Sequence, residues 1–279
     1  MEKRIEYYEF PNKEIVKAVH TDAVYRFDQE KKSWEIDYSL TAVFAWDKPY
    51  GDPCLQLRKK VDLSGDLPPF PCEEMFFPGN TVAFGAYPQK SLYDFSPISW
   101  IVLETKDSTA LCIAKDCLIV SGYCDPQNSY QKPEKLWWEN SLARQSLNQD
   151  FYDTAFSDEE KARIIPREVS AVQLGKRCTD PVFLLSEQEV LHYFPEEKDR
   201  KARPTHYATL HNARSGWTED TKEYTSWWIL PEENAYGYQN GLAFPKAVFQ
   251  MGMIQFHSRN IYHTDFTLRP CIQIRYKND

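Results

Sequence analysis

Glycine is scarce in this sequence, and two familiar patterns are missing from it: a spaced set of cysteines and a long apolar run. The 279 residues include 10 glycines against 18 prolines, so many turns have to form without glycine. The 7 cysteines are irregularly spaced, with neither a CxxC pair nor a CxxC…HxxxH pattern, which leaves a zinc site or a disulfide framework without support. We therefore predict reduced thiols, no metal and no other cofactor.

A membrane segment and a secretion signal are also missing from the sequence. No stretch approaches the roughly 20 apolar residues that cross a bilayer. The first residues, MEKRIEYYEF, carry charges where a signal peptide has its apolar core. The sequence thus predicts a cytoplasmic protein with no membrane partner.

Positive charge is not in excess either. The formal net charge is -8 and the isoelectric point is near 5.4, with the negative charge spread evenly along the chain. Because no basic surface is indicated, we expect no nucleic-acid partner. Aromatic residues, in contrast, are abundant at 15%, with 8 Trp and 17 Tyr. Such side chains serve either packing or recognition.

Composition divides the chain into two parts. Within residues 22–46, two β-rich runs flank the polar DQEKKS, a pattern typical of a hairpin with a longer loop. The stretch 62–79, DLSGDLPPFPCEEMFFPG, is rich in proline and has no hydrophobic period, which indicates a linker. We therefore predict a small β-rich N-terminal domain over residues 1–75 and a larger domain over residues 76–279.

The larger domain has predicted strands at both ends and helices between them. This segregation along the chain favours an α+β fold over a parallel βαβ sheet. Two of the helices begin with a capping box, in which a serine and a glutamate three residues later satisfy free backbone amides. The predicted strands are 81–88, 98–104, 109–115 and 117–121, the helices are 140–152, 157–165 and 186–194, and short strands alternate with polar loops from about residue 205.

Seven collinear stretches of the larger domain resemble the motifs of a known family. They are FGAYPQ (84–89), PISWIVLE (97–104), WENSLARQSLNQDFYDTAFSDEEKARI (138–164), DPVFLLSEQEV (180–190), RPTHYA (203–208), SWWILP (226–231) and LRPCIQI (268–274). Together they resemble a bacterial domain family of unknown function. The later motifs of that family are similar to the core of the C-type lectin-like fold, so the resemblance implies this fold for the larger domain. It implies no activity.

The sequence departs from the family pattern at three places. After the double tryptophan it has Ile229-Leu230-Pro231 in place of Leu-Arg-Ser-Pro, so an arginine is lost. The last motif begins Thr267-Leu268 in place of Gly-Val, and Ser146 stands where a tryptophan is common. The lost arginine weakens the inference that a family site beside the tryptophans is retained.

Two late segments combine aromatic and amide side chains, a mixture found on recognition surfaces. They are the loop 232–241 and the run HSRNIYHTD at 257–265. In lectin-like folds such late loops lie together and form the binding face, while the alternative is that both are ordinary surface loops. The predicted ligand-binding residues are Trp228, Asn234, Tyr236, Tyr238, Asn240, His257, Arg259 and Tyr262.

The two adjacent tryptophans also have a packing interpretation. In a strand, Trp227 and Trp228 point to opposite faces of the sheet, so one is expected in the core and the other towards a second layer or solvent. Large aromatic side chains usually serve packing, and a packing role for both is the alternative to ligand contact.

Two arginines in motif positions are predicted to be structural. Arg144 and Arg269 are expected to hold helix and sheet together, either by pairing with a buried carboxylate or by capping carbonyls. Glu139 and Glu160 are the candidate carboxylates. We expect Arg269→Ala mainly to lower thermal stability.

Two chemical sites can be drawn from the sequence, and neither has a local signature. Glu232, Glu233 and Asn234 are oxygen donors beside a proline, but calcium takes 6–8 oxygen ligands and only Asp265 offers a further carboxylate downstream, so solvated acids are the better interpretation. Cys178 and His206 could form a nucleophile–base pair, yet nothing local marks them. We predict no catalytic residues.

The function predicted from the sequence is therefore a non-catalytic binding domain for a glycan, peptide or protein, which is bound through the two late loops. A hydrolase or modifying enzyme with its site in the cleft between the two domains is the alternative. A third interpretation is a structural or phage-associated protein whose late loops are ordinary surface.

Overall fold

The computed structural model describes residues 70–90, 95–124, 138–169, 178–230, 246–256 and 265–277, together with the backbone of five strands before residue 62. Both helices and sheets are present, which confirms the predicted α+β class. Among the helices in these described ranges, none is long and apolar enough to cross a membrane.

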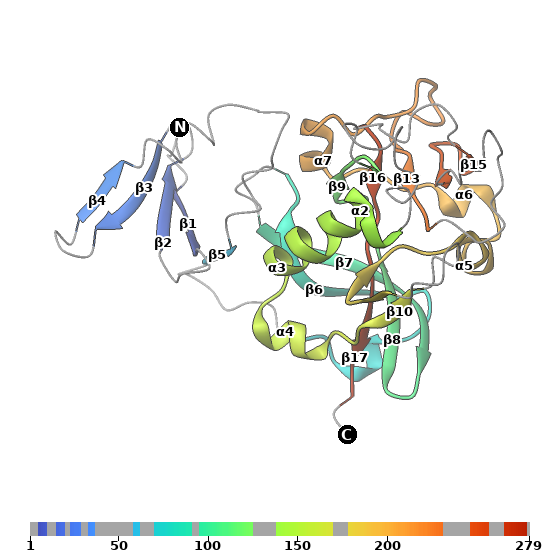
Figure 1. The fold of residues 1–279 in the computed structure, drawn as a ribbon, viewed down its shortest axis with the longest axis horizontal. Coiled ribbons are helices and arrows are strands. Elements are labelled where there is room, and N and C mark those ends of the chain that lie inside the picture. The colour runs from blue at the N-terminus through green and yellow to red at the C-terminus, as the bar shows by residue number, and fades with distance from the viewer. Residues whose placement is uncertain are drawn as a thin grey trace.

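The N-terminal strands form a five-stranded antiparallel sheet of their own (Figure 1). Its strand order is β4-β3-β2-β1-β5. Asp28 at the end of β3 pairs with Ser33 at the start of β4, so the predicted hairpin is confirmed. The bounds are β1 Ile5–Glu9, β2 Ile15–Val19, β3 Ala23–Asp28, β4 Ser33–Ile36 and β5 Arg58–Val61.

The main sheet of the larger part is also antiparallel, in the order β12-β17-β8-β7-β6. The last strand of the chain, β17, lies between β12 and β8, so neighbouring strands flank it on both sides. The adjacent residues Cys271 and Ile272 point to opposite faces of β17 and both are buried, so both faces of the sheet are covered here. The bounds are β6 Thr81–Pro88, β7 Phe95–Lys106, β8 Thr109–Ala114, β12 Val182–Phe183 and β17 Cys271–Arg275.

A helical segment lies against this sheet. The helices α2 (Leu142–Gln145) and α3 (Tyr152–Ala155) are joined by the π-helical turn η5 (Ser146–Phe151), so residues 142–155 form one helix with a bulge. Leu147 and Phe151 are fully buried, and Phe151 packs edge-on against Tyr87 of β6. The helix predicted over 140–152 is thus present, shifted by two to three residues, after a 3-10 turn η4 (Trp138–Asn140).

Both predicted capping boxes are confirmed. Ser157 and Glu160 cap α4 (Asp158–Arg163), and Ser186 and Glu189 cap α5 (Glu187–Tyr193). Glu160 also accepts a hydrogen bond from Gly85 N at 3.1 Å, so this cap ties α4 to strand β6.

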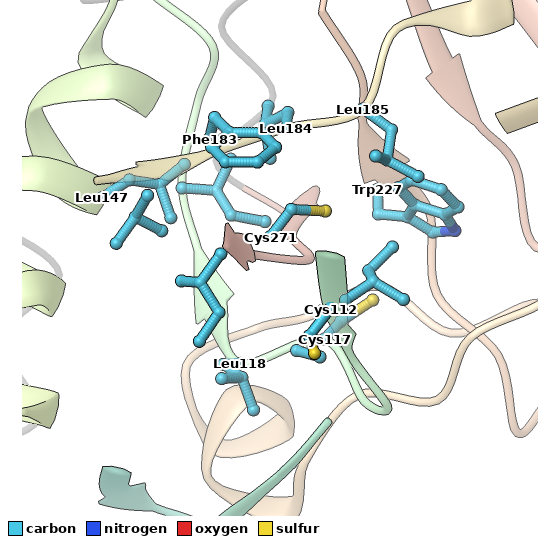
Figure 2. Packing of buried hydrophobic residues seen from close by; sticks show 14 of the residues in the cluster. Cys112, Cys117, Leu118, Leu147, Phe183, Leu184, Leu185, Trp227 and Cys271 are labelled. Atoms are coloured by element: carbon cyan, nitrogen blue, oxygen red, sulfur yellow. The ribbon is translucent and has the colours of Figure 1, made fainter. Parts of the chain in front are cut away.

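A second five-stranded sheet has the order β15-β14-β13-β16-β9. The chain passes from β16 of this sheet to β17 of the main sheet through Arg269 and Pro270, so both sheets share one core. Figure 2 shows Trp227, Phe183, Cys271 and Leu147 packed in this cluster. The bounds are β9 Ile119–Val120, β13 Trp227–Trp228, β14 Lys246–Val248, β15 Ile254–Phe256 and β16 Thr267–Leu268.

The region after residue 205 differs from the expected strands and loops, because it begins with helix α7 (His206–Leu210). Thr205 caps this helix by accepting a hydrogen bond from Ala208 N. Five residues are too few to show a helical period in the sequence, which explains the wrong prediction. The remaining elements are the 3-10 turn η2 (Glu73–Met75), helix α6 (Glu197–Arg200), and the short ladder of β10 (Arg167–Val169) with β11 (Cys178–Asp180).

The proline-rich stretch packs onto the larger part of the protein in its second half. Phe70 stacks on Phe76 with ring centroids 5.7 Å apart, and Phe76 stacks on Tyr276 at 4.9 Å. The Arg163 guanidinium lies 4.0 Å from the centre of the Phe70 ring. Residues 70–76 therefore contribute to the same core as β6 and β17, although the predicted boundary lies at 75/76.

Candidate binding surface

Trp228 is buried in the core. The prediction that this residue contacts a ligand is therefore corrected. Its exposed fraction is 0%, and its Nε1 donates to Ser121 O at 2.9 Å. On the other face of β13, Trp227 is also buried and donates to Arg200 O at 3.1 Å. Both tryptophan side chains are therefore packed in the core, on opposite faces of β13, and neither is exposed to a ligand.

The other seven predicted ligand-binding residues lie outside the described residues. Two separate segments contain them, 231–245 and 257–264. The same holds for Glu232 and Glu233, the proposed calcium donors. The described parts of the chain contain no group of three or more His, Cys, Asp or Glu side chains that could hold a metal ion.

The directions of the neighbouring strands show where the residues that flank these two segments lie. β13 pairs antiparallel with β14, and β14 pairs antiparallel with β15. Trp228 lies opposite Ala247, and Lys246 lies opposite Phe256, so β13 ends, β14 begins and β15 ends at one end of the sheet. The ends of β13 and β15 thus lie at one end of this sheet, while Asp265, just before β16, lies at the opposite end, because β16 runs parallel to β13.

Trp217 is an exposed aromatic residue whose ring lies near Arg214. Its exposed fraction is 86%, against 37% to 53% for the other exposed large apolar side chains in the described ranges. It lies in the loop 211–224, between α7 and β13. The backbone of this loop joins the end of the second late segment, because Arg214 N donates to Asp265 O at 2.9 Å.

Hydrogen bonds within the loop fix the position of Trp217. Gly216 N, directly before it, points at the carbonyls of Thr221 and Tyr224, both at 3.2 Å. Thr218 N, directly after it, donates to Thr221 Oγ1 at 3.2 Å. A Cβ atom on Gly216 would lie 2.2 Å from Thr221 Oγ1 and 2.6 Å from Thr221 O, so glycine is required for this packing. The tryptophan is therefore exposed on a loop that packs tightly on itself.

Three cations in or beside the loop pair with carboxylates. The Arg214 guanidinium lies 5.6 Å from the centre of the Trp217 ring and 3.5 Å from the Asp265 carboxylate. Lys222 pairs with Glu219 at 2.5 Å. Arg203 pairs with Glu223, also at 2.5 Å. We call Trp217, Arg214 and Asp265 the Trp217 surface.

The two motif arginines are used inside the fold. Arg144 Nε donates to both carboxylate oxygens of Asp180, at 2.9 and 3.0 Å, and its Nη2 donates to Oδ1 at 2.7 Å. Trp138 Nε1 donates to the same carboxylate at 2.7 Å. These bonds to Asp180 raise the pKa of Arg144. The carboxylate partner is thus Asp180, where Glu139 and Glu160 were expected; Arg144 Nη1 donates to the backbone carbonyl of Glu139 at 3.2 Å.

Arg269 caps carbonyls, one of its two predicted roles. Its Nε donates to Ala114 O at 2.9 Å and its Nη2 to Lys115 O at 3.2 Å, where strand β8 ends. The guanidinium lies between the rings of Phe194 and Trp227, at 5.4 and 5.2 Å. Burial lowers its pKa, and Nη1 has no hydrogen-bond partner among the described residues. Arg269 therefore holds the crossover between the two sheets in place.

The chain was compared with known proteins. A family model described as "Domain of unknown function (DUF6273)" matches residues 108–276, more than half of the chain. The chain belongs to this family. No curated protein and no solved structure matches the chain.

The DUF6273 match does not cover the whole of the main sheet. Strands β6 and β7 both precede residue 108, yet they complete this sheet and pack on its core. The match does include Trp217, Arg214 and Asp265, so the Trp217 surface belongs to the family part of the chain.

The sequence analysis missed Trp217, although a signal was present. The residue stands in the polar run RSGWTEDTKE, where the residues two and three positions away on either side are all polar. A tryptophan in such a run has no neighbours with which to form a core, which favours the surface.

Buried thiols offer little for catalysis. Burial raises the pKa of Cys112 and of Cys117 to about 12, and it raises the pKa of Cys271 as well. Because the thiolate is the reactive form, these three cysteines are inert in the folded protein. In the Cys178–His206 pair drawn from the sequence, Cys178 lies in β11, opposite Val169, and His206 begins α7.

Proposed function

We propose that this protein is a non-catalytic binding protein whose larger domain has a C-type lectin-like core. It binds a glycan, peptide or protein through the segments 231–245 and 257–264 together with the Trp217 surface. The small N-terminal domain, residues 1–75, supplies assembly or a second contact.

Three features of the fold support the lectin-like part of the proposal. The last strand returns to the middle of the main sheet, and a second small sheet holds the double tryptophan. The helical segment 142–155 packs beside the main sheet. The Leu-Arg-Pro motif makes the crossover between the two sheets, with Arg269 capping carbonyls there.

The observation on which the binding function rests is the exposure of Trp217. A large aromatic side chain that is 86% exposed gains nothing from packing in the isolated protein, and its loop is held by its own hydrogen bonds. Indole rings placed in this way are enriched where proteins contact ligands. The backbone hydrogen bond from Arg214 N to Asp265 O ties the Trp217 loop to the residue that follows segment 257–264.

The cellular location is part of the same proposal. Cys112, Cys117 and Cys271 are buried as thiols outside any disulfide, which agrees with a reducing compartment such as the cytoplasm. No observation on the described residues favours the alternative of an enzyme in the interdomain cleft.

The test is a binding screen on arrays of glycans, peptides and proteins with the purified full chain. We compare it with Trp217→Ala and with a Tyr236/Tyr238/Tyr262 triple alanine variant. The matched control is Leu210→Ala, which truncates a different exposed apolar side chain, 51% exposed, at the end of α7. Binding that is lost in either test variant and kept in the control supports the proposal. Binding that survives both variants, or no binding to any array, refutes it.

A further inference from the structure

We infer that the Trp217 surface is a subsite for a neutral saccharide, whose pyranose ring stacks on the Trp217 indole. This inference rests on the proposed binding function and names the ligand class. It is drawn from three properties of the surface: a single exposed ring, charges that occur in pairs, and a loop that is fixed before the ligand arrives.

The single ring fits a sugar better than a protein partner. Protein interfaces need a buried cluster of anchor residues surrounded by further contact area. In the loop 211–224, Trp217 is the only large apolar side chain that is exposed among the described residues, with polar residues on both sides of it. A pyranose has one apolar face of C–H groups of about the size of an indole ring and hydroxyl groups around its edge, so it matches one ring with polar surroundings.

The paired charges favour a neutral ligand. Arg214, Lys222 and Arg203 each lie within ion-pair distance of a carboxylate, from Asp265, Glu219 and Glu223. Because these cations are already compensated, the surface has no excess of positive charge with which to attract a phosphate, sulfate or carboxylate group. An ion pair presents a donor and an acceptor side by side, and neighbouring hydroxyl groups of a sugar offer the complementary arrangement. Arg214 lies beside the ring and pairs with Asp265, so this ion pair can serve in this way.

The fixed loop lowers the cost of binding. Gly216, Thr218 and Thr221 hold the backbone on both sides of Trp217, so the indole does not require an ordering of the loop when a ligand stacks on it. Weak stacking contacts therefore give measurable affinity.

The experiment uses the full chain labelled with 5-fluorotryptophan and one-dimensional fluorine NMR. The Trp217 signal is assigned from its loss in Trp217→Phe. The probes are neutral hexasaccharides of glucose, mannose, galactose, xylose and N-acetylglucosamine, and the anionic probes are a galacturonate hexamer and a heparin-derived hexamer. We expect at least one neutral probe to shift the Trp217 signal at millimolar concentration, while signals of the buried Trp100, Trp138, Trp227 and Trp228 stay in place and report an intact fold.

Variants separate stacking from a general surface effect. Titrations of the unlabelled variants by calorimetry should show Trp217→Ala weakening the neutral probe by roughly tenfold or more, because the stacking contact is lost. Trp217→Tyr should retain most of the affinity, since a ring remains. Arg214→Met should weaken binding as well, and Leu210→Ala should leave it unchanged.

Other results would overturn the inference. Preference for the anionic probes would contradict the charge argument. Trp217-dependent binding of peptides or proteins without any neutral saccharide would remove the ligand class while leaving the binding function intact. Binding that depends on Tyr236, Tyr238 and Tyr262 but not on Trp217 would have the same effect. If no probe of any class binds, both the subsite and the proposed function fail.

Discussion

Removal of the Asp180 carboxylate is the sharpest test of how the family motifs stabilise this fold. The side chain is 1% exposed and accepts three hydrogen bonds from Arg144 and one from Trp138. These bonds join the start of the helical segment 142–155 to strand β11. Asp180→Ala leaves a buried indole N–H without an acceptor and a guanidinium without its anion.

The magnitude follows from the burial of each partner. Breaking a fully buried ion pair costs about 3–5 kcal/mol. The Arg144 side chain is 30% exposed, so water can solvate part of the orphaned guanidinium and the ion-pair cost falls towards the lower limit. The Trp138 N–H is fully buried and adds about 1–3 kcal/mol as an unsatisfied donor. We therefore expect Asp180→Ala to lower the free energy of unfolding by about 4 kcal/mol.

The assay is urea denaturation followed by circular dichroism, with a double-mutant cycle. Asp180→Asn is the matched variant, since it keeps an acceptor for Trp138 and loses the charge, and it should cost about half as much as alanine. Arg144→Met alone and combined with Asp180→Ala gives the coupling energy of the pair, which should reach about 2 kcal/mol. A loss below about 1 kcal/mol in Asp180→Ala, or additive single variants, would refute this account.

Three further predictions test other parts of the core. Gly85→Ala should destabilise the fold by about 2 kcal/mol or more, because φ is +68° and the new Cβ would lie 2.6 Å from the Phe156 ring and 2.9 Å from Ala155 O. A melting temperature within about 2 °C of that of the parent would contradict this prediction. Arg269→Ala should lower the free energy of unfolding, measured by urea denaturation, by about 2–4 kcal/mol, because two carbonyls lose their donor while the buried, unpartnered Nη1 is also removed. Arg269→Met should recover part of this loss. Equal stability of the parent and the alanine variant would show that the capping is unimportant. At a pH near 9.0, iodoacetamide should label the exposed Cys72 in the native protein, but it should label Cys112 and Cys117 only after unfolding, because burial raises the pKa of both thiols from 9.0 to about 12. Mass spectrometry of each cysteine peptide measures the labelling, and rapid labelling of Cys112 in the native protein would contradict this prediction.

Local patterns in the sequence were sufficient to predict the elements with strong signals. The strand predicted over 81–88 has the bounds Thr81–Pro88, because its β-branched and aromatic residues end at a proline. The helices α4 and α5 begin where their Ser–Glu capping boxes lie. In each case the deciding interaction is within a few residues of the chain, so a single sequence contains it.

Long-range partners could not be predicted in the same way. The candidate carboxylates for Arg144 were close in sequence, whereas the true partner, Asp180, lies 36 residues away and is set by the packing of β11 against the helix. Trp228 was assigned to the ligand because one face of its strand was expected to lie towards a second layer or solvent. The structure places that face against Tyr123 and Phe266, so both faces of β13 are covered.

The contacts of the motif residues also bear on where function lies in the DUF6273 family. Arg144 and Asp180 satisfy each other, Glu160 and Glu189 are used in capping boxes, and Arg269 binds main-chain carbonyls. Side chains whose hydrogen bonds are already made inside the core are not available to a substrate, so these residues account for the scaffold of this chain. Under the proposed function, the ligand is bound by residues outside these contacts, and Trp217 lies in the loop between α7 and β13. If the ligand differs among members of the family, the difference should therefore lie in this loop and in the two late segments, while the Arg144–Asp180 pair stays the same.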